Sequence, residues 1–126
     1  MNHEIIDKAQ KLYTSGKPEE AVKLLMPLVN KGDLIAKSNL GFIYCYSFYE
    51  NGEFIKIKEG EVLLNEACEA GEPSACHNLG TLWSAEMPSI GHDLRKAAQY
   101  YLKARELGGP IATKDFYDRW EEILNG

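Results

Sequence analysis

Gly32-Asp33-Leu34-Ile35-Ala36 is the first copy of a Gly-x-x-x-Ala pattern that decides the fold. The pattern returns as Gly71-Glu72-Pro73-Ser74-Ala75 and as Gly108-Gly109-Pro110-Ile111-Ala112, at intervals of 39 and 37 residues. Each copy is typical of a helix end followed by a helix start, because glycine ends a helix in the left-handed conformation and proline or a polar residue opens the next one. Repetition at such intervals indicates an array of similar helical units.

Other residues keep the same register from unit to unit. The dipeptide Leu-Gly follows the first two alanines at Leu40-Gly41 and Leu79-Gly80. An aromatic residue stands eight positions after every alanine, at Tyr44, Trp83 and Trp120. Apolar residues at steps of three, four and seven place one face of a helix in a core, so the repeated units are predicted to be helical.

The spacing predicts an all-α chain of seven helices, with no sheet. These would form three antiparallel hairpins and a final capping helix, with hairpins at about 1–32, 33–71 and 72–108 and the cap at 109–126. The helices are predicted at 2–15, 18–31, 34–50, 57–70, 74–86, 93–107 and 111–124.

Small residues are expected where helices approach closely. Gly41 and Gly80 each cost a helix about 1 kcal/mol relative to alanine, which a stable helix tolerates when another backbone must pass nearby. The facing positions on the second helices are small, at Ala21, Gly60 and Ala97. In the final helix Tyr117 occupies the position of Gly41 and Gly80, and it is expected to cover the end of the array.

Composition and charge restrict the function. The chain has 126 residues, 44% of them apolar, enough for a hydrophobic core in a single domain. Its net charge of −5 argues against nucleic acid or anionic lipid as the main partner and leaves a basic protein open. Seven charged residues are spread over the first twenty positions, which leaves no room for the apolar segment of a secretory signal, and no apolar run is long enough to cross a bilayer. We therefore expect a cytoplasmic protein.

The whole chain resembles helical repeat proteins. The first hairpin is similar to a tetratricopeptide repeat, with Ala9 and Ala21 at the family's spacing of twelve, although Lys8 and Asp33 depart from its pattern. The next two resemble the longer Sel-one-like repeat, above all over residues 93–108. This resemblance implies a short right-handed α-solenoid, 1–126, whose role is to bind other proteins.

The cysteines admit two interpretations. Cys68 and Cys76 are eight residues apart across a helix-helix turn, a spacing similar to that of disulfide-bonded members of the family, where a bond would stabilise by about 2–3 kcal/mol. The alternative is a pair of buried thiols in a reducing cytosol, which the absence of a signal sequence favours. Cys45 has no evident partner.

Signatures of catalysis are weak, so no enzyme activity, cofactor or metal is predicted. The three histidines are far apart, and there is no Cys-x-x-Cys, phosphate loop or nucleophile elbow. The adjacent carboxylates Glu19-Glu20 and Glu121-Glu122 suit solvated helix positions better than acid-base chemistry.

The candidate site is instead the concave face that the first helices of stacked hairpins would line. Phe42 and Tyr46 are its most informative residues, because they give their helix a second apolar face that must be sandwiched or bind something. A clamp for a chaperone's C-terminal carboxylate is disfavoured, since the matching positions lack its basic residues. The resemblance places these residues on that face: Ile6, Gln10, Tyr13, Ser38, Phe42, Cys45, Tyr46, His77, Thr81, Ser84, Lys114 and Asp118.

The function predicted is non-catalytic protein binding. A sharper hypothesis is an immunity protein that neutralises a basic toxin, which the small size and acidic charge favour. The alternative from another class is a redox-responsive protein or enzyme that uses Cys45, Cys68 or Cys76.

Overall fold

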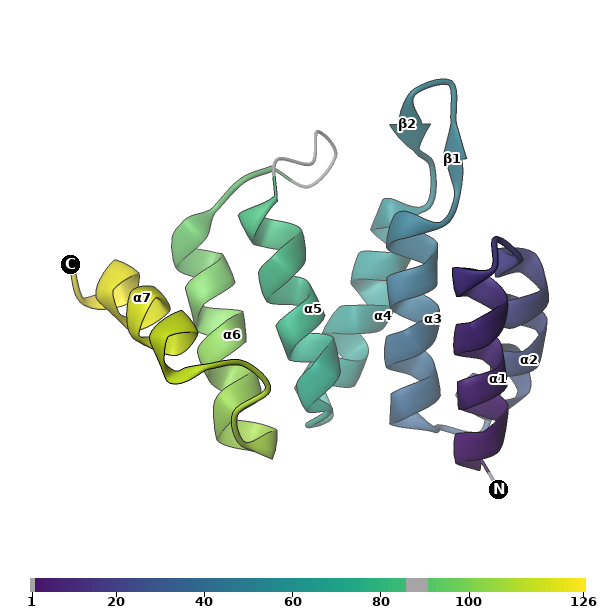
Figure 1. Cartoon of the computed structure of the whole chain (residues 1–126), viewed down its shortest axis with the longest axis horizontal. Coiled ribbons are helices and arrows are strands. Elements are labelled where there is room, and N and C mark those ends of the chain that lie inside the picture. The colour runs from purple at the N-terminus through teal and green to yellow at the C-terminus, as the bar shows by residue number, and fades with distance from the viewer. Residues whose placement is uncertain (1, 86–90) are drawn as a thin grey trace.

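A computed structural model describes residues 2–85 and 91–126 and contains seven helices and one small hairpin in that part of the chain (Figure 1). The prediction of an all-α chain is therefore confirmed in its main features. The elements are α1 (Asn2–Thr14), α2 (Pro18–Asn30), α3 (Leu34–Tyr46), β1 (Tyr49–Glu50), β2 (Glu53–Phe54), α4 (Ile57–Glu69), α5 (Pro73–Ser84), α6 (Leu94–Gly108) and α7 (Lys114–Asn125).

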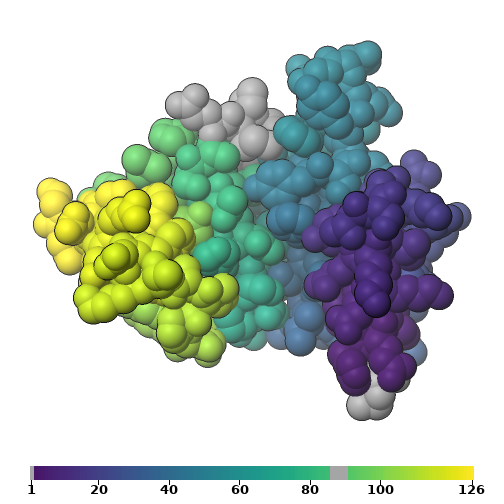
Figure 2. Space-filling view, viewed as in Figure 1, coloured from purple at the N-terminus to yellow at the C-terminus, as the bar shows by residue number. Residues whose placement is uncertain are grey.

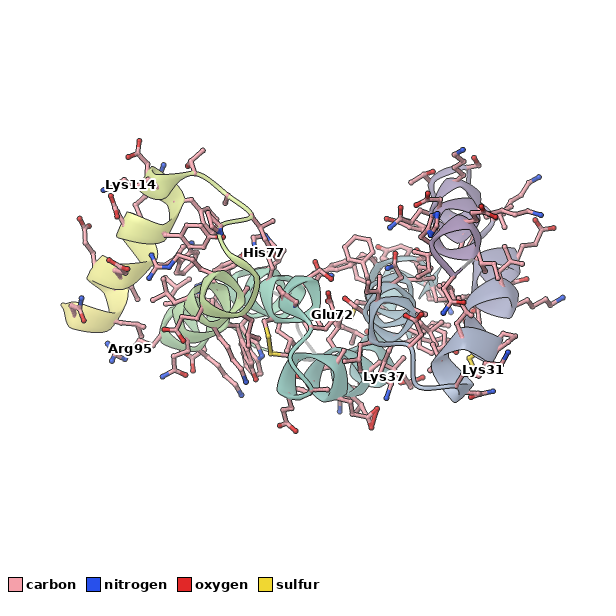
Figure 3. The ribbon with its side chains drawn as sticks, turned by 90° about the horizontal axis from the view of Figure 1, so that it is seen from below. Lys31, Lys37, Glu72, His77, Arg95 and Lys114 are labelled. Atoms are coloured by element: carbon pink, nitrogen blue, oxygen red, sulfur yellow. A yellow bond between two sulfur atoms is a disulfide. The ribbon has the colours of Figure 1, made fainter. Side chains whose placement is uncertain are left out.

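The helices give a repeat-like architecture in which each packs mainly on the helices before and after it in the chain. A second set of contacts joins α1 to α3 and α3 to α5, so these helices form one row. Seen from below, the helices follow an arc with α1 and α7 at its two ends (Figure 3). The space-filling view shows α1 and α7 standing on either side of the surface formed by α3 and α5 (Figure 2).

The first two repeat glycines act as predicted. Gly32 and Gly71 have φ values of +89° and +100°, in the left-handed region that glycine adopts without steric cost. The helices that follow are capped by carboxylates. The Asp33 side chain accepts a hydrogen bond from the Ala36 N–H at 2.9 Å, and Glu72 caps α5 in the same way.

The third copy departs from the pattern. Helix α6 continues through Gly108, and the left-handed residue is Gly109, with φ +82°. A Cβ on Gly108 would collide with Pro73 of α5, so this glycine allows the end of α6 to approach α5. The prediction that Gly108 ends the helix is therefore wrong by one residue.

Helix α7 begins at Lys114 rather than at 111, and Tyr117 explains the intervening loop. The buried Tyr117 hydroxyl accepts hydrogen bonds from the backbone N–H groups of Ile111 and Ala112, at 2.8 and 3.2 Å. These groups would otherwise enter a first helical turn. The loop therefore stays open until Thr113, whose side chain accepts from the Phe116 N–H and caps α7.

The predicted close approach of two helix backbones is confirmed for α3 and α4, whereas at Gly80 a side chain of α6 lies against α5. A Cβ on Gly60 would lie 2.6 Å from the Gly41 carbonyl oxygen, so the backbones of α3 and α4 nearly touch there. At Gly80, by contrast, a Cβ would lie 2.7 Å from the ring of Tyr101. An aromatic side chain of α6, rather than the backbone beside Ala97, takes the space that Gly80 leaves.

The segment after α3 forms a hairpin that was not predicted. A helix was expected to residue 50, and no sheet, but α3 ends at Tyr46 and an antiparallel hairpin pairs Tyr49 with Phe54 and Glu50 with Glu53. Its turn is Asn51-Gly52, with φ values of +53° and +83°. Positive φ at both residues is the geometry of the two-residue turn that Asn-Gly favours.

The remaining helix bounds agree with the prediction to within about two residues. Residue 86, the predicted last residue of the fifth helix, lies outside the described residues. In the described part of the chain, no helix combines the length and apolar character that crossing a membrane requires.

Candidate functional site

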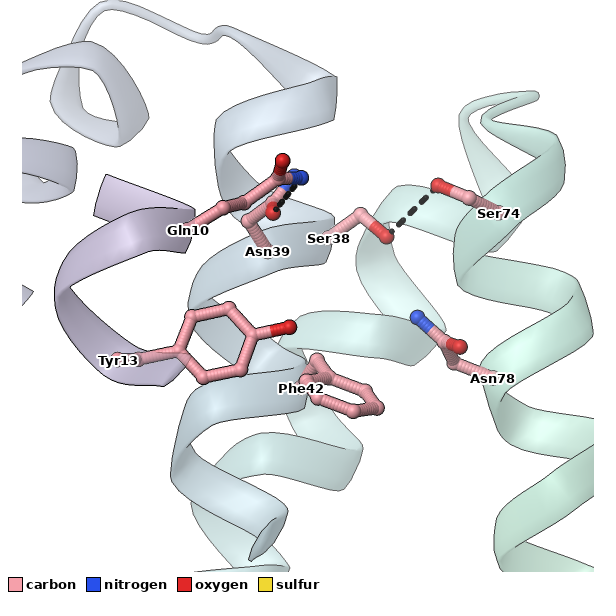
Figure 4. Close-up of a pocket in the computed structure, with 7 residues that line it drawn as sticks. All are labelled: Gln10, Tyr13, Ser38, Asn39, Phe42, Ser74 and Asn78. Carbon is pink, nitrogen blue, oxygen red and sulfur yellow. Dashed lines mark hydrogen bonds between the residues drawn. The ribbon is translucent and has the colours of Figure 1, made fainter. Parts of the chain in front are cut away.

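A groove of about 200 Å³ lies across the row of helices α1, α3 and α5. Figure 4 shows its lining side chains converging from these three helices. We call it the inner groove. Its lining residues are all uncharged: Gln10, Tyr13, Ser38, Asn39, Phe42, Ser74 and Asn78.

Hydrogen bonds between helices fix part of the lining. The Gln10 amide donates to the Asn39 side-chain oxygen at 2.9 Å, joining α1 to α3. The hydroxyl groups of Ser38 and Ser74 lie 3.1 Å apart and join α3 to α5 (Figure 4). These bonds hold the three helices in register and position the amides beside the groove.

Among the amide and serine side chains of the lining, Asn78 alone has no hydrogen-bond partner within the described residues, whereas Gln10, Ser38, Asn39 and Ser74 are bonded. It lines the groove on the α5 side (Figure 4). A carboxamide carries both a donor and an acceptor, the same pair of groups that a peptide unit presents. Asn78 is therefore free to pair with a bound backbone.

Aromatic rings form a continuous row from the inner groove to the hairpin. The ring centroids of Tyr13 and Phe42 are 5.8 Å apart, and those of Phe42 and Tyr46 are 5.0 Å apart. Phe54 continues the row at 6.3 Å from Tyr46, and Tyr49 follows at 4.9 Å. Such centroid distances are favourable for aromatic pairs, so the rings stabilise one another and form a continuous apolar surface.

Phe42 and Tyr46 are half-buried, so neighbouring elements cover them only in part. The Tyr46 hydroxyl is buried and has no hydrogen-bond partner within the described residues. Burial raises the pKa of Tyr46 to about 12, with smaller contributions from Cys45 and Tyr101. Tyr46 therefore stays neutral at physiological pH and contributes its ring to the aromatic row.

The structure brings together four of the residues predicted for the concave face, Gln10, Tyr13, Ser38 and Phe42. Ser38 is not outward, however: it is only 1% exposed, because its hydroxyl is turned toward Ser74 at the contact between α3 and α5. It forms the floor of the inner groove rather than an accessible contact.

Two other expected surface residues are in the core. Ile6 and Cys45 were both placed on the outward face, yet they are 6% and 0% exposed. Cys45 points toward α4, where its thiol donates to the Ile57 carbonyl oxygen at 3.7 Å. Burial raises the pKa of Cys45 to about 12, with a smaller effect from Glu61, so this thiol is a poor nucleophile at neutral pH.

The predicted residues of α5 belong to a different cluster. His77 lies against Tyr101 of α6 and Phe116 of α7, with ring centroids 4.9 and 5.8 Å away. The Thr81 hydroxyl lies 2.9 Å from that of Tyr101, and the Ser84 hydroxyl lies 3.4 Å from it. These side chains join α5 to α6 and α7, so none of them lines the inner groove.

Burial determines the charge state of the His77 side chain. The side chain is half-buried among rings, its Nδ1 atom has no partner within the described part of the chain, and burial lowers its pKa. His77 is therefore neutral in the folded protein at physiological pH.

The two predicted residues of α7 pair with each other. The Lys114 Nζ lies 2.7 Å from an Asp118 carboxylate oxygen, and this hydrogen bond raises the pKa of the exposed lysine. A pair of this kind at a spacing of four along one helix is a surface feature of small energetic weight. The single concave site of the prediction is thus divided in two, and Lys114 and Asp118 belong to neither part.

Three lining residues, Asn39, Ser74 and Asn78, are not among those predicted for the concave face. Asn39-Leu40-Gly41 and Asn78-Leu79-Gly80 are one repeat interval apart, so the two asparagines occupy equivalent positions. Extending the Leu-Gly match by one residue toward the N-terminus would have found them.

Cys68 and Cys76 form a disulfide in the structure, across the turn between α4 and α5. The pairing agrees with the spacing, but it differs from the interpretation favoured above, a pair of buried thiols. Whether the cell keeps the bond oxidised stays a prediction. In residues 2–85 and 91–126, no three histidine, cysteine or acidic side chains are grouped to hold a metal ion.

The chain has no significant match among models of known protein families, curated proteins or solved structures. The features that bear on its function are therefore the inner groove and the surfaces around it.

Proposed function

We propose that this protein is a non-catalytic protein-binding module whose inner groove holds an extended segment of a partner. The observation that carries the proposal is the lining itself: amide and hydroxyl groups beside a row of aromatic rings, with no charged side chain. Aromatic rings supply contact area at low entropic cost, and amides supply donors and acceptors for a peptide backbone.

We also propose a finer description of the architecture. The chain is a right-handed α-solenoid of the Sel-one-like and tetratricopeptide type, with three antiparallel hairpins and a cap formed by α7. The repeated Gly-x-x-x-Ala pattern, the close contact of Gly41 with Gly60 and the neighbour-to-neighbour packing support it. In such an array the first helices line the concave face, where α1, α3 and α5 lie.

The amide positions suit an extended ligand. Asn39 and Asn78 stand at equivalent positions of α3 and α5, and Gln10 of α1 lies beside Asn39. The Asn39 amide is already bonded on both sides, to Gln10 and to the Ile35 carbonyl oxygen. A strand bound across the helices would therefore pair with the Asn78 amide and the Gln10 side-chain oxygen, with alternate side chains toward Phe42 and Tyr13. The groove carries no charge, so binding should depend little on salt.

A more specific form of the proposal is an immunity protein that neutralises a basic toxin in the cytoplasm. Its support is the small size of the chain and the charge of −5. Co-expression with the product of the adjacent upstream gene tests it: we expect this protein to relieve that product's toxicity. If that gene encodes no toxin, the immunity role is wrong, and the general binding role is unaffected.

Cysteine chemistry, the alternative from another class, has little structural support. Cys45 is fully buried with a raised pKa, and Cys68 is bonded to Cys76. If serine at all three positions abolished the biological activity of a protein that stays folded, the cysteine alternative would replace the binding proposal.

The test of the inner groove compares matched asparagine variants. Peptides selected from a random library on the wild-type protein are measured by calorimetry against Asn78→Ala and Asn30→Ala. Asn30 is exposed at the end of α2, outside the groove lining. We expect Asn78→Ala to weaken binding roughly tenfold, the effect of about one hydrogen bond left unmade.

The Asn30→Ala variant should bind such peptides as the wild type does. Equal binding by both variants and the wild type would remove Asn78 from the binding surface. Peptides that bind only through charge, with affinity lost in moderate salt, would also contradict the proposal for an uncharged groove.

A further inference from the structure

The hydroxyl group of Ser74 connects the inner groove to a charged side chain. Ser74 is half-buried in the first turn of α5 and lines the groove together with Asn78 (Figure 4). Its hydroxyl donates to the carboxylate of Glu72, which also caps α5 by accepting from the Ala75 N–H at 3.0 Å. Glu72 is not one of the lining residues, so it would act on a ligand through Ser74.

The protons of this network can be assigned one by one. A serine hydroxyl has one proton to donate and two lone pairs that accept, whereas an ionised carboxylate only accepts. The proton of Ser74 is therefore used by Glu72, in a charge-assisted bond stronger than a neutral one. The Ser38 hydroxyl lies 3.1 Å from the Ser74 oxygen, so Ser38 must be the donor of that bond.

Burial maintains this direction on the α3 side. Ser38 is 1% exposed, so bulk water does not compete for its proton. The Ser74 oxygen thus accepts one hydrogen bond and donates one, and its second lone pair has no partner within the described residues. Such an atom can accept a hydrogen bond from a ligand but has no proton to donate to it.

The repeat provides a comparison within the same chain. Asp33 occupies the position equivalent to Glu72 and caps α3 in the same way, by accepting from a backbone N–H. The residue equivalent to Ser74 is Ile35, which has no hydroxyl group. The capping carboxylate is thus common to both helices, whereas its connection to the groove through a hydroxyl belongs to α5.

We propose that Glu72 is a positioning residue that holds Ser74 as an acceptor for one backbone N–H group of the bound segment. The inference rests on the proposed function of the inner groove and specifies the chemistry of the ligand at one point. Asn78 is one helical turn further along α5 and its carboxamide is free. The segment can therefore give an N–H to Ser74 and a carbonyl oxygen to Asn78.

The direction of the hydrogen bonds would make this contact selective. A ligand atom that only accepts would face a Ser74 lone pair with no proton between them. Two acceptors buried against each other are both left unsatisfied, which costs more than the absence of a single bond. The groove should therefore reject a segment that lacks an N–H at this point, such as one with proline there.

The test replaces the backbone N–H groups of a groove-binding peptide one at a time. The probe is a peptide that is selected from a random library on the wild-type protein and that binds more weakly to Asn78→Ala. In each derivative the matching α-hydroxy acid takes the place of one residue, so that an ester oxygen replaces one N–H. We expect the ester to weaken binding roughly tenfold at the position that faces Ser74, as measured by calorimetry.

Two variants identify that position and test the role of Glu72. Ser74→Ala should bind the amide and ester forms about equally there, because the acceptor itself is gone. Glu72→Ala keeps the hydroxyl but frees its proton to turn toward the ligand. The preference of Glu72→Ala for the amide over the ester should therefore fall below about threefold.

Two matched controls separate this effect from a general loss of stability. Asp33→Ala removes the equivalent cap from α3, and Ser38→Ala removes a hydroxyl but leaves the Ser74 proton on Glu72. Both should keep the full preference for the amide. Partial unfolding of a variant weakens the amide and ester forms by the same factor, so their ratio reports on the contact alone.

Failure of this inference is distinguishable from failure of the proposed function. If no selected peptide is weakened by Asn78→Ala, the proposed function is wrong and the inference is wrong with it. If such peptides exist, three results would overturn the inference alone. These are an ester preference that Ser74→Ala leaves unchanged at every position, a full preference for the amide in Glu72→Ala, and an equal loss of preference in Asp33→Ala.

Discussion

Gly60 sets the separation of α3 and α4. A Cβ at this position would lie 2.5 Å from the Cys45 sulfur and 2.6 Å from the Gly41 carbonyl oxygen. Helix propensity alone favours alanine over glycine by about 1 kcal/mol. The collision involves backbone and a buried side chain that cannot move away easily, so it should outweigh that gain.

We therefore predict that Gly60→Ala lowers the free energy of unfolding by about 1–3 kcal/mol, the usual range for overpacking. Urea denaturation followed by circular dichroism measures it. Val62→Ala is the control, because Val62 is on the same helix and 57% exposed. A Gly60→Ala protein more stable than the wild type would show that α3 and α4 do not approach closely here.

His77 should make stability depend on pH. Its pKa is lowered from 6.5 in the folded protein, so the unfolded chain binds a proton more readily. Its contribution to stability is complete above about pH 6.5 and is lost as the pH falls below that value toward the folded-state pKa.

Unfolding measured between about pH 5 and pH 8 tests this contribution. The His77→Gln variant should show a smaller loss of stability on acidification than the wild type. His92→Gln, at an exposed position, should behave as the wild type does. If His77→Gln retains the full pH dependence, His77 is not the residue responsible.

The hairpin of β1 and β2 shows how local sequence can override an extended helical pattern. Apolar and aromatic residues continue from α3 to Tyr49 and favoured a longer helix, but Asn51-Gly52 is a strong hairpin signal in the sequence itself. The apolar pattern alone predicts a longer helix, whereas the Asn-Gly turn needs positive φ at two successive residues, which a helix does not allow.

The hairpin should be separable from the helices. Replacing Gly52, at φ +83°, with alanine strains the turn by about 1 kcal/mol or more, whereas Asn51→Gly keeps a suitable turn. We expect Gly52→Ala to lose hydrogen-exchange protection at the Ile55 amide with unchanged helicity, and Asn51→Gly to keep it. Continued protection in Gly52→Ala would mean that packing, not the turn, maintains the hairpin.

The disulfide across the turn between α4 and α5 determines how many thiols can react. With Cys68 and Cys76 bonded, only Cys45 is free. Protein purified without reductant and then denatured should react with one equivalent of thiol reagent, and with three after reduction. Three equivalents before reduction would show that the pair is reduced, and the expected stabilisation of about 2–3 kcal/mol would then be absent.

At the scale of the whole molecule, repetition was the most reliable signal. Gly32, Gly71 and the Leu-Gly dipeptides located most of the helices, because helix ends depend on local chemistry that recurs in each unit. The start of the last helix was less predictable. It depends on hydrogen bonds from the preceding loop to the Tyr117 hydroxyl, and the local sequence pattern does not indicate such a contact.

The candidate site was predictable only in part. The positions of residues within the repeats correctly predicted that Gln10, Tyr13 and Phe42 lie on one surface, the inner groove. The same reasoning wrongly placed His77 on this surface, because Phe116 of α7 packs against His77. It also wrongly predicted an accessible Ser38, because α3 and α5 are in contact there. Both depend on how far each helix rotates toward its neighbours, which side-chain packing sets.

The most direct test of the binding role is to map a selected peptide on the isotopically labelled protein by amide chemical shifts. We predict that the largest shifts fall on α1, α3 and α5, around Gln10, Asn39, Phe42 and Asn78, and that they persist in moderate salt. Shifts confined to the outer helices α2, α4 and α6, with the inner groove unaffected, would contradict it.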